Sequence, residues 1–345
     1  MSRPIDIYIC GSQAEQAPAH DANLLNVRSI ADRPLDRLST AELNESLHAA
    51  DSDLVGFVDS RLSELLADMG EFVSRLVANQ TPVALKLGND ASAADWQNFP
   101  QTLAALIRPI AENAAVFVRK SHLDAHGKLA DNDDPLWEWI VRCINQGEHV
   151  EIDASNTQNR SGTAMTGEGQ TLPKLAPKKP GRSKSWLRDA ILSVDPKTWK
   201  RDGISHIELT AIKAGLLQIH DFLDASHEQS QSIEHQGRDR DGNYWHAIMH
   251  RREPDYGNSK YWFRNVGDHP IFPQLAEMAQ KVGSHYSATD VVGSFADREW
   301  DPFAFVDFCQ HCARTGDAKA TQVAEEVQWL EMQLLLTHCY SSAVG

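Results

Sequence analysis

Residues 157–184 read TQNRSGTAMTGEGQTLPKLAPKKPGRSK, and this stretch divides the chain into two parts with different sequence patterns. It is rich in Gly, Pro, Ser, Thr and Lys and contains almost nothing that a core would bury, which predicts a flexible linker. Its six cationic residues against one acid leave two interpretations open, a solubilising tether or a contact with an anionic partner. We therefore predict two domains, residues 1–156 and 185–345, joined by this linker.

The part before the linker alternates short apolar runs with helical patterns. Apolar or β-branched runs bounded by turn residues lie at 5–11, 53–59, 82–88 and 113–120, and helical spacing of apolar residues occurs at 62–80 and 135–147. Strands that alternate with helices predict an α/β domain with a largely parallel sheet.

The part after the linker has helical patterns only. The first of them, at 203–234, opens with Ser205 and Glu208 in the spacing of a capping box. The others lie at 243–252, 271–282, 302–315 and 318–340. We predict an all-α helical bundle. The sequence CQHC at 309–312 falls inside one of these patterns and has no second CxxC to complete a site, so a half-buried helix turn is favoured over a zinc or redox site.

Composition limits the classes of function. A chain of 345 residues with 41% hydrophobic and 23% charged residues is typical of globular proteins, and its formal charge of -15 argues against broad binding to nucleic acid or to a membrane surface. We find no apolar run of the roughly 20 residues that a membrane span needs and no signal-peptide pattern, so we expect a cytoplasmic protein. Five sparse cysteines do not indicate a disulfide framework.

Two stretches of the first part carry a resemblance. NESLHAADSDLVGFVDSRLSELLADMGEFVSRLVANQTPV (44–83) and AAVFVRKSHLDAHGKLADNDDPLWEWIVRCINQGEHVEI (114–152) resemble the middle and the acceptor-side segment of family 2 glycosyltransferases. The resemblance implies a GT-A or Rossmann-like fold, with Asp59 at the first position of the metal-binding D-x-D motif and Asp133 as the base. Arg61 stands at the second position, and a guanidinium cannot ligate a cation.

The resemblance does not extend to the segment that binds the sugar-nucleotide donor in this family. YICGSQAEQAPAHDANL (8–24) lacks the family's tyrosine-asparagine turn and its acidic nucleotide-binding strand. The resemblance therefore implies a degenerate domain that keeps the fold without the chemistry and serves as a scaffold or protein-partner module. An active glycosyltransferase with an atypical donor site is the alternative.

In the second part, polar residues gather on one face of the helix predicted at 203–234. Positions four and seven apart share a face, so His220, Asp224 and His227 project together. Lys213 and Glu234 lie one or two turns away on nearly the same side.

The next predicted helix has the H-x-x-x-H spacing at His246 and His250, with Glu253 three residues further. If the two helices pack antiparallel, up to four histidines and Asp224 meet as ligands for zinc, iron or manganese. Hydrogen-bonded core or surface histidines, and a metal-free site, are the alternatives that remain open.

Cations and aromatic residues surround the PDYGN sequence at 254–258. Guanidinium groups beside aromatic rings suit a small anionic ligand, because a guanidinium can donate two parallel hydrogen bonds to the anion while an aromatic ring stacks on a flat part of the ligand. Buried salt bridges, Arg252 to Asp255 or Glu253 to Lys260, are the alternative. The candidate ligand-binding residues are Arg251, Arg252, Asp255, Tyr256, Lys260, Tyr261, Trp262 and Arg264.

A second resemblance covers most of residues 195–282. GLLQIHDFLDASHEQSQSIE (215–234) and YWHAIMHRREPDYGNSKYWFRNVGDHP (244–270) resemble an uncharacterised helical family of bacteria and fungi, which implies no activity. The residues themselves favour a metal-dependent hydrolase or lyase in which the catalytic set is Asp224, His246, His250 and Glu253, with Asp224 or Glu253 as the base on metal-bound water. A non-catalytic module that binds an anionic ligand or a partner is the competing hypothesis.

Overall fold

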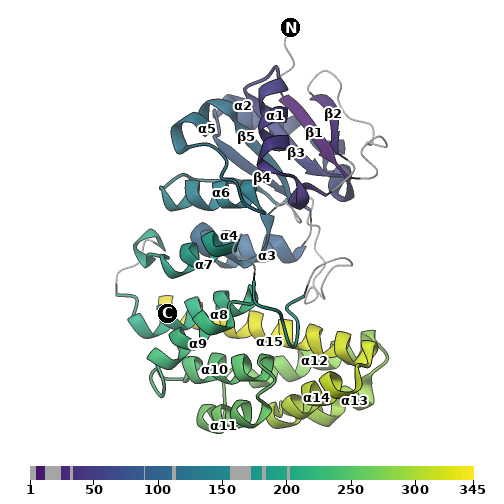
Figure 1. Cartoon of the computed structure of the whole chain (residues 1–345), viewed down its shortest axis with the longest axis vertical. Helices are drawn as coiled ribbons and strands as arrows, with labels where there is room; N and C mark the ends of the chain where they lie inside the picture. The colour runs from purple at the N-terminus through teal and green to yellow at the C-terminus, as the bar shows by residue number, and fades with distance from the viewer. Residues whose placement is uncertain are drawn as a thin grey trace. The chain divides into compact units, whose positions relative to one another are not determined.

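The computed structural model (Figure 1) describes residues 5–11, 25–31, 34–88, 90–110, 114–155, 172–180, 184–199 and 203–345. The chain forms two compact units. The first unit comprises residues 1–162 and 183–190, and the second unit comprises residues 163–182 and 191–345.

The first unit contains one sheet with the strand order β2-β1-β3-β5-β4-β6 (Figure 1). Its strands are β1 (Ile5–Cys10), β2 (Leu25–Ala31), β3 (Leu54–Asp59), β4 (Val83–Leu87), β5 (Ala114–Arg119) and β6 (Glu151–Asp153). The four predicted strands correspond to β1, β3, β4 and β5, each within about two residues of its expected bounds. The sequence patterns did not reveal β2 and β6.

The direction of β5 corrects the expectation of a largely parallel sheet. β1 pairs parallel with β2 and β3, and β4 pairs parallel with β6, but β5 runs antiparallel to both β3 and β4. Residues of β5 are buried along almost the whole strand, as in a parallel strand that is covered on both faces. The apolar composition of β5 therefore does not indicate whether the strand runs parallel or antiparallel to its neighbours. The sheet is mixed.

The described part of the first unit also contains helices. They are α1 (Thr40–Ala49), α2 (Gly70–Ala78), α3 (Asp90–Asn98), α4 (Gln101–Ile107), α5 (Lys120–His126) and α6 (Pro135–Asn145). The single helix predicted at 62–80 is instead a 3-10 segment, Ser60–Asp68, followed by α2. In β3, Gly56 leaves room for neighbouring strands, since a Cβ there would lie 2.6 Å from Ile7 Cδ1 and 2.7 Å from Phe117 Cε1.

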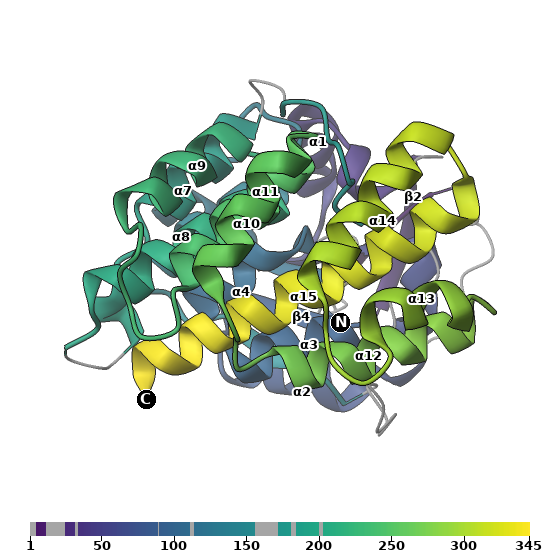
Figure 2. The ribbon, with the colours of Figure 1, turned by 90° about the horizontal axis from the view of Figure 1, so that it is seen from below.

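The second unit is helical in its described residues. Its helices are α8 (His206–Ile219), α9 (Leu223–Ser232), α10 (Asp241–Arg252), α11 (Tyr256–Val266), α12 (Phe272–His285), α13 (Thr289–Ala296), α14 (Pro302–Thr315) and α15 (Ala318–Val344), whereas α7 (Ser185–Leu192) lies mostly in the first unit, which includes residues 183–190. The patterns at 243–252, 271–282, 302–315 and 318–340 are confirmed as α10, α12, α14 and α15. In Figures 1 and 2 the long α15, in yellow, runs beside α8 and α12.

The helix predicted at 203–234 is interrupted at Asp221, whose φ is 65°. Arg252 occupies the break, because its guanidinium pairs with Asp221 Oδ1 at 2.5 Å and donates to the Gln218 carbonyl, which closes the end of α8. The predicted capping box is also wrong, since the Ser205 side chain makes no cap hydrogen bond. α8 and α9 are therefore two helices with independent faces.

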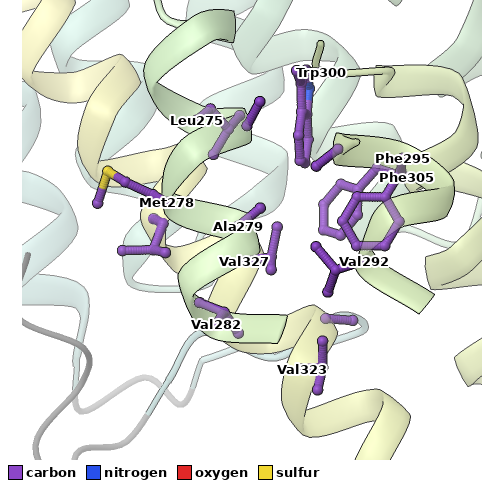
Figure 3. Close-up of a cluster of buried hydrophobic side chains, with 14 of the residues drawn as sticks. Leu275, Met278, Ala279, Val282, Val292, Phe295, Trp300, Phe305, Val323 and Val327 are labelled. Carbon is purple, nitrogen blue, oxygen red and sulfur yellow. The ribbon is translucent and has the colours of Figure 1, made fainter. Parts of the chain in front are cut away.

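One apolar cluster of the second unit joins α12, α13, α14 and α15 (Figure 3). Leu275 and Val282 of α12 pack with Phe295 and with Val327 of α15. Cys309 and Cys312 of the CQHC sequence are buried in the same cluster, and burial raises the pKa of their thiols to about 12 and about 11. Gln310 and His311 between them are exposed, so the CQHC sequence is a half-buried helix turn, as predicted.

Residues 172–180 are the part of the predicted linker that the structure describes most fully. Leu175 lies in the apolar cluster of the second unit. The Lys174 carbonyl accepts hydrogen bonds from Arg252 Nε at 3.0 Å and from Gln328 Nε2 at 3.3 Å. This part is therefore packed against helices; apart from Lys184, the rest of 157–184 lies outside the described residues. Among the residues that the structure describes, no helix is long and apolar enough to cross a membrane.

Candidate metal centre

Three histidines from α9 and α10 meet inside the second unit. One nitrogen of each of His227, His246 and His250 lies within 4.8 Å of the others. The ring centroids are 4.7 Å apart between His227 and His246, 5.4 Å between His227 and His250, and 4.8 Å between His246 and His250. We call these residues the histidine triad.

Close packing of α8, α9 and α10 positions the histidine triad (Figure 2). A Cβ at Gly215 of α8 would lie 2.5 Å from Trp245 Cζ2, so only glycine lets the Trp245 ring fit there. On α9, the buried Ser226 donates from Oγ to the Ala214 carbonyl at 2.9 Å. These contacts hold His227, next to Ser226, over the turn of α10 that carries His246.

Helix α11 closes another side of the triad. Trp262 stacks on His246, with ring centroids 4.0 Å apart and an interplanar angle of 19°. The Asn258 side-chain amide lies 3.1 Å from His250 Nε2. When the amide is turned so that its oxygen accepts from Nε2–H, Nδ1 of the neutral ring keeps the lone pair that a metal needs. The rings of His246 and His250 are thus fixed in orientation.

Several imidazole nitrogens of the triad have no hydrogen-bond partner among the described residues. They are both nitrogens of His246 and Nδ1 of His250. The nearest carboxylates, Glu234 Oε1 and Glu253 Oε2, each lie 3.7 Å from an Nδ1 atom, which is beyond hydrogen-bond length. A buried polar group without a hydrogen bond destabilises the folded protein by about 1–3 kcal/mol. A bound ligand would remove this cost for these nitrogens.

Burial keeps the two α10 imidazoles neutral. Burial, followed by the neighbouring His250 and His227, lowers the pKa of His246 from 6.5 to about 3. Burial, followed by His227, lowers the pKa of His250 from 6.5 to about 4. A neutral imidazole offers a lone pair, which is the form that binds a metal.

The structure does not bring His220 and Asp224 into the triad. His220 ends α8, and Asp224 is an exposed residue paired with Lys179 at 2.7 Å. The reason is the break at Asp221, because the spacing of four and seven places residues on one face only within a continuous helix.

Arg251 and Arg252 occupy interior ion pairs. Arg251 is 1% exposed and pairs through two hydrogen bonds with Glu331, which is 0% exposed. Arg252 binds Asp221 and two backbone carbonyls. The predicted ligand-binding guanidinium groups are therefore used inside the protein, and their partners differ from the salt bridges that the sequence suggested.

The other candidate ligand-binding residues are dispersed over α11, which begins where the sequence suggested a turn. Asp255 caps α11, Tyr256 packs against the apolar cluster, and Lys260 pairs with Asp307 at 2.5 Å. Tyr261 is 50% exposed, whereas the Arg264 guanidinium lies 5.7 Å from the centre of the Phe303 ring. These side chains do not converge on one anion.

Two further clusters were missed. In the first unit, His122, His126 and Glu148 form a group able to hold a metal ion, and the spacing of its histidines on α5 was a usable signal. In the second unit, Asp241, His269 and His338 form such a group. Their separation along the chain leaves no local signal.

In the first unit, the Asp59 carboxylate is fully engaged. It accepts from Arg61 Nε at 2.8 Å and Nη2 at 3.0 Å, and from the backbone nitrogens of Arg61 and Leu35. Burial favours the neutral acid, but these hydrogen bonds outweigh it and hold the pKa of Asp59 below its usual value. Asp133 is an exposed residue between α5 and α6.

No family model, no curated protein and no solved structure matches the chain.

Proposed function

We propose that the second unit binds a divalent transition metal through the histidine triad and uses it to activate water in a hydrolase or lyase reaction. The main support is the set of buried, neutral imidazole nitrogens that converge without hydrogen-bond partners. Imidazole suits zinc, iron and manganese to different degrees, and zinc sites with three protein ligands keep a position for water.

Two carboxylates beside the triad are candidates for the base. Glu234 lies 3.7 Å from Nδ1 of His246, and Glu253 lies 3.7 Å from Nδ1 of His250. A bound metal lowers the pKa of its water to about 7, and a nearby carboxylate can take the proton. Glu234 replaces Asp224 in this proposal, because Asp224 points to solvent.

A metal-binding module without catalysis is the alternative. This alternative rests on the same triad. Because Arg251 and Arg252 are buried, they are not free to bind an anionic substrate, which favours a metal-binding module. Metal uptake is common to both proposals, whereas turnover distinguishes them.

We expect the chelator-treated, full-length protein to bind zinc at the triad, and His250→Ala to weaken this binding more than about 100-fold, because a ligand matters more than its outer-shell partners. Isothermal titration with zinc measures both constants. Helical content should stay unchanged, since His250 lies on an otherwise intact α10.

His311→Ala is the matched control, because His311 is an exposed histidine of α14. Zinc binding that is the same in His250→Ala and in the control would refute the metal site. For catalysis, zinc-dependent hydrolysis of chromogenic phosphate and carboxylic esters should fall by about 10²-fold or more in Glu234→Gln. Metal binding without any turnover supports the module instead.

For the first unit we propose a degenerate glycosyltransferase-like domain that binds a protein partner. The support is the bidentate pair between Arg61 and Asp59, which uses the carboxylate that a metal-diphosphate clamp would need.

We expect the full-length protein to show no manganese-dependent binding of UDP-sugars or GDP-sugars, because a cation would have to displace the Arg61 guanidinium from Asp59. Titration calorimetry with and without manganese tests this. Micromolar binding that requires manganese would restore Asp59 and Asp133 as functional residues and favour the glycosyltransferase with an atypical donor site.

A further inference from the structure

A second polar cluster of the second unit lies where α10 begins and α15 passes. His338 Nε2 of α15 is 3.1 Å from Asp239 Oδ2 and 3.7 Å from Asp241 Oδ1. His269 Nε2 is 2.9 Å from the same Asp241 oxygen. One imidazole nitrogen of the cluster thus faces two carboxylates.

A cavity of about 410 Å³ opens beside this cluster. Asp239, Asp241 and His338 line it, together with Glu208 and the hydroxyl-bearing Ser341. His269 is fully buried and does not line it. Of the cluster, Asp239, Asp241 and His338 are therefore the residues that an incoming ion can reach from the cavity.

His269 has the position of a supporting residue. Its Nδ1 accepts from the Ile271 backbone nitrogen at 3.4 Å, so its neutral form carries the proton on Nε2 and donates to Asp241. This hydrogen bond orients the Asp241 carboxylate, as outer-shell groups do for metal ligands.

The charge around the cavity favours a cation. Three carboxylates face it, from Glu208, Asp239 and Asp241. Glu208 Oε2 is a buried atom with no hydrogen-bond partner among the described residues. The one arginine in the lining, Arg238, has a side chain that is 95% exposed and lies 3.9 Å from Asp239, so solvent screens most of its effect.

We propose that Asp239, Asp241 and His338 form a second divalent-cation site that opens into this cavity, with His269 as a positioning residue. One imidazole with carboxylate oxygens suits Mn²⁺ or Zn²⁺ better than Ca²⁺. The site is separate from the histidine triad: Asp241 and His246 are five positions apart on α10 and so project roughly 140° from each other. It does not depend on the function proposed above.

The test is a manganese titration of the chelator-treated, full-length protein, with free Mn²⁺ counted by electron paramagnetic resonance. We expect the double variant Asp239→Asn/His338→Gln to lose one equivalent of bound Mn²⁺ that His250→Ala retains. Both changed side chains are partly exposed, so circular dichroism should show an unchanged fold. Glu208→Gln should weaken the same equivalent by about 10-fold or more, as loss of a nearby carboxylate does.

Three results would overturn the second site. They are the absence of any Mn²⁺ binding by the wild-type protein, an unchanged number of equivalents and affinity in Asp239→Asn/His338→Gln, and loss of the equivalent in His250→Ala, which would place it at the triad. If the double variant does not fold, the Mn²⁺ affinity of Glu208→Gln becomes the test, and an affinity equal to that of the wild-type protein refutes the proposal. Failure of the triad would instead appear as unchanged zinc affinity in His250→Ala.

Discussion

Replacing Arg251 with Met should lower the free energy of unfolding of the second unit by about 3–5 kcal/mol, as expected when one partner of a buried ion pair is removed. The variant leaves Glu331 buried, with the Tyr244 hydroxyl at 3.1 Å as its other side-chain donor. It also removes the guanidinium that lies 4.6 Å from the centre of the Phe305 ring. Urea unfolding followed by circular dichroism measures the change.

Two variants test the cause. Arg251→Met/Glu331→Leu should recover most of the lost stability, because replacing both members of a buried pair with apolar residues is often neutral or stabilising. Lys281→Met, which breaks the exposed pair with Glu277, should change the midpoint little. A double variant as unstable as Arg251→Met would show that packing around Arg251, and not the stranded charge, holds the unit together.

Acid should destabilise the metal-free second unit steeply, well above the pH at which carboxylates titrate. The pKa values of His246 and His250 are lowered to about 3 and about 4 in the folded protein, against about 6.5 in the unfolded chain. Below pH 6.5 the unfolded chain therefore binds protons that the folded protein does not. The free energy of unfolding should fall by about 1.4 kcal/mol per pH unit for each histidine as the pH drops from about 6.5 towards 4.

Urea midpoints between about pH 7 and pH 5, in the presence of a chelator, measure this slope. His246→Leu should remove roughly half of the histidine contribution, while His311→Gln, at the exposed histidine of α14, should leave the slope unchanged. A slope that is equal in all three proteins would mean that the triad is not the acid-sensitive element. Added zinc should raise the midpoints at neutral pH by mass action.

Local patterns predicted the elements of the fold better than their arrangement. The strands β1, β3, β4 and β5 follow from short continuous apolar runs, and the helices α10, α12, α14 and α15 follow from helical spacing of apolar residues; both signals lie in neighbouring residues. The direction of β5 and the interruption at Asp221 cannot be predicted from neighbouring residues, because each depends on a partner that is distant in the sequence. Arg252, which occupies the interruption, lies 31 positions from Asp221.

The candidate site shows the same division. The sequence by itself determined that His246 and His250 share one face of a helix, because their spacing of four matches the helical turn. Only the tertiary structure decided that His227 joins them while Asp224 does not, that Arg251 turns inward to Glu331 80 positions away, and that His338 meets Asp239 and Asp241. These outcomes depend on which helices pack together, and packing partners are chosen by the summed burial of whole faces, which no single short stretch encodes.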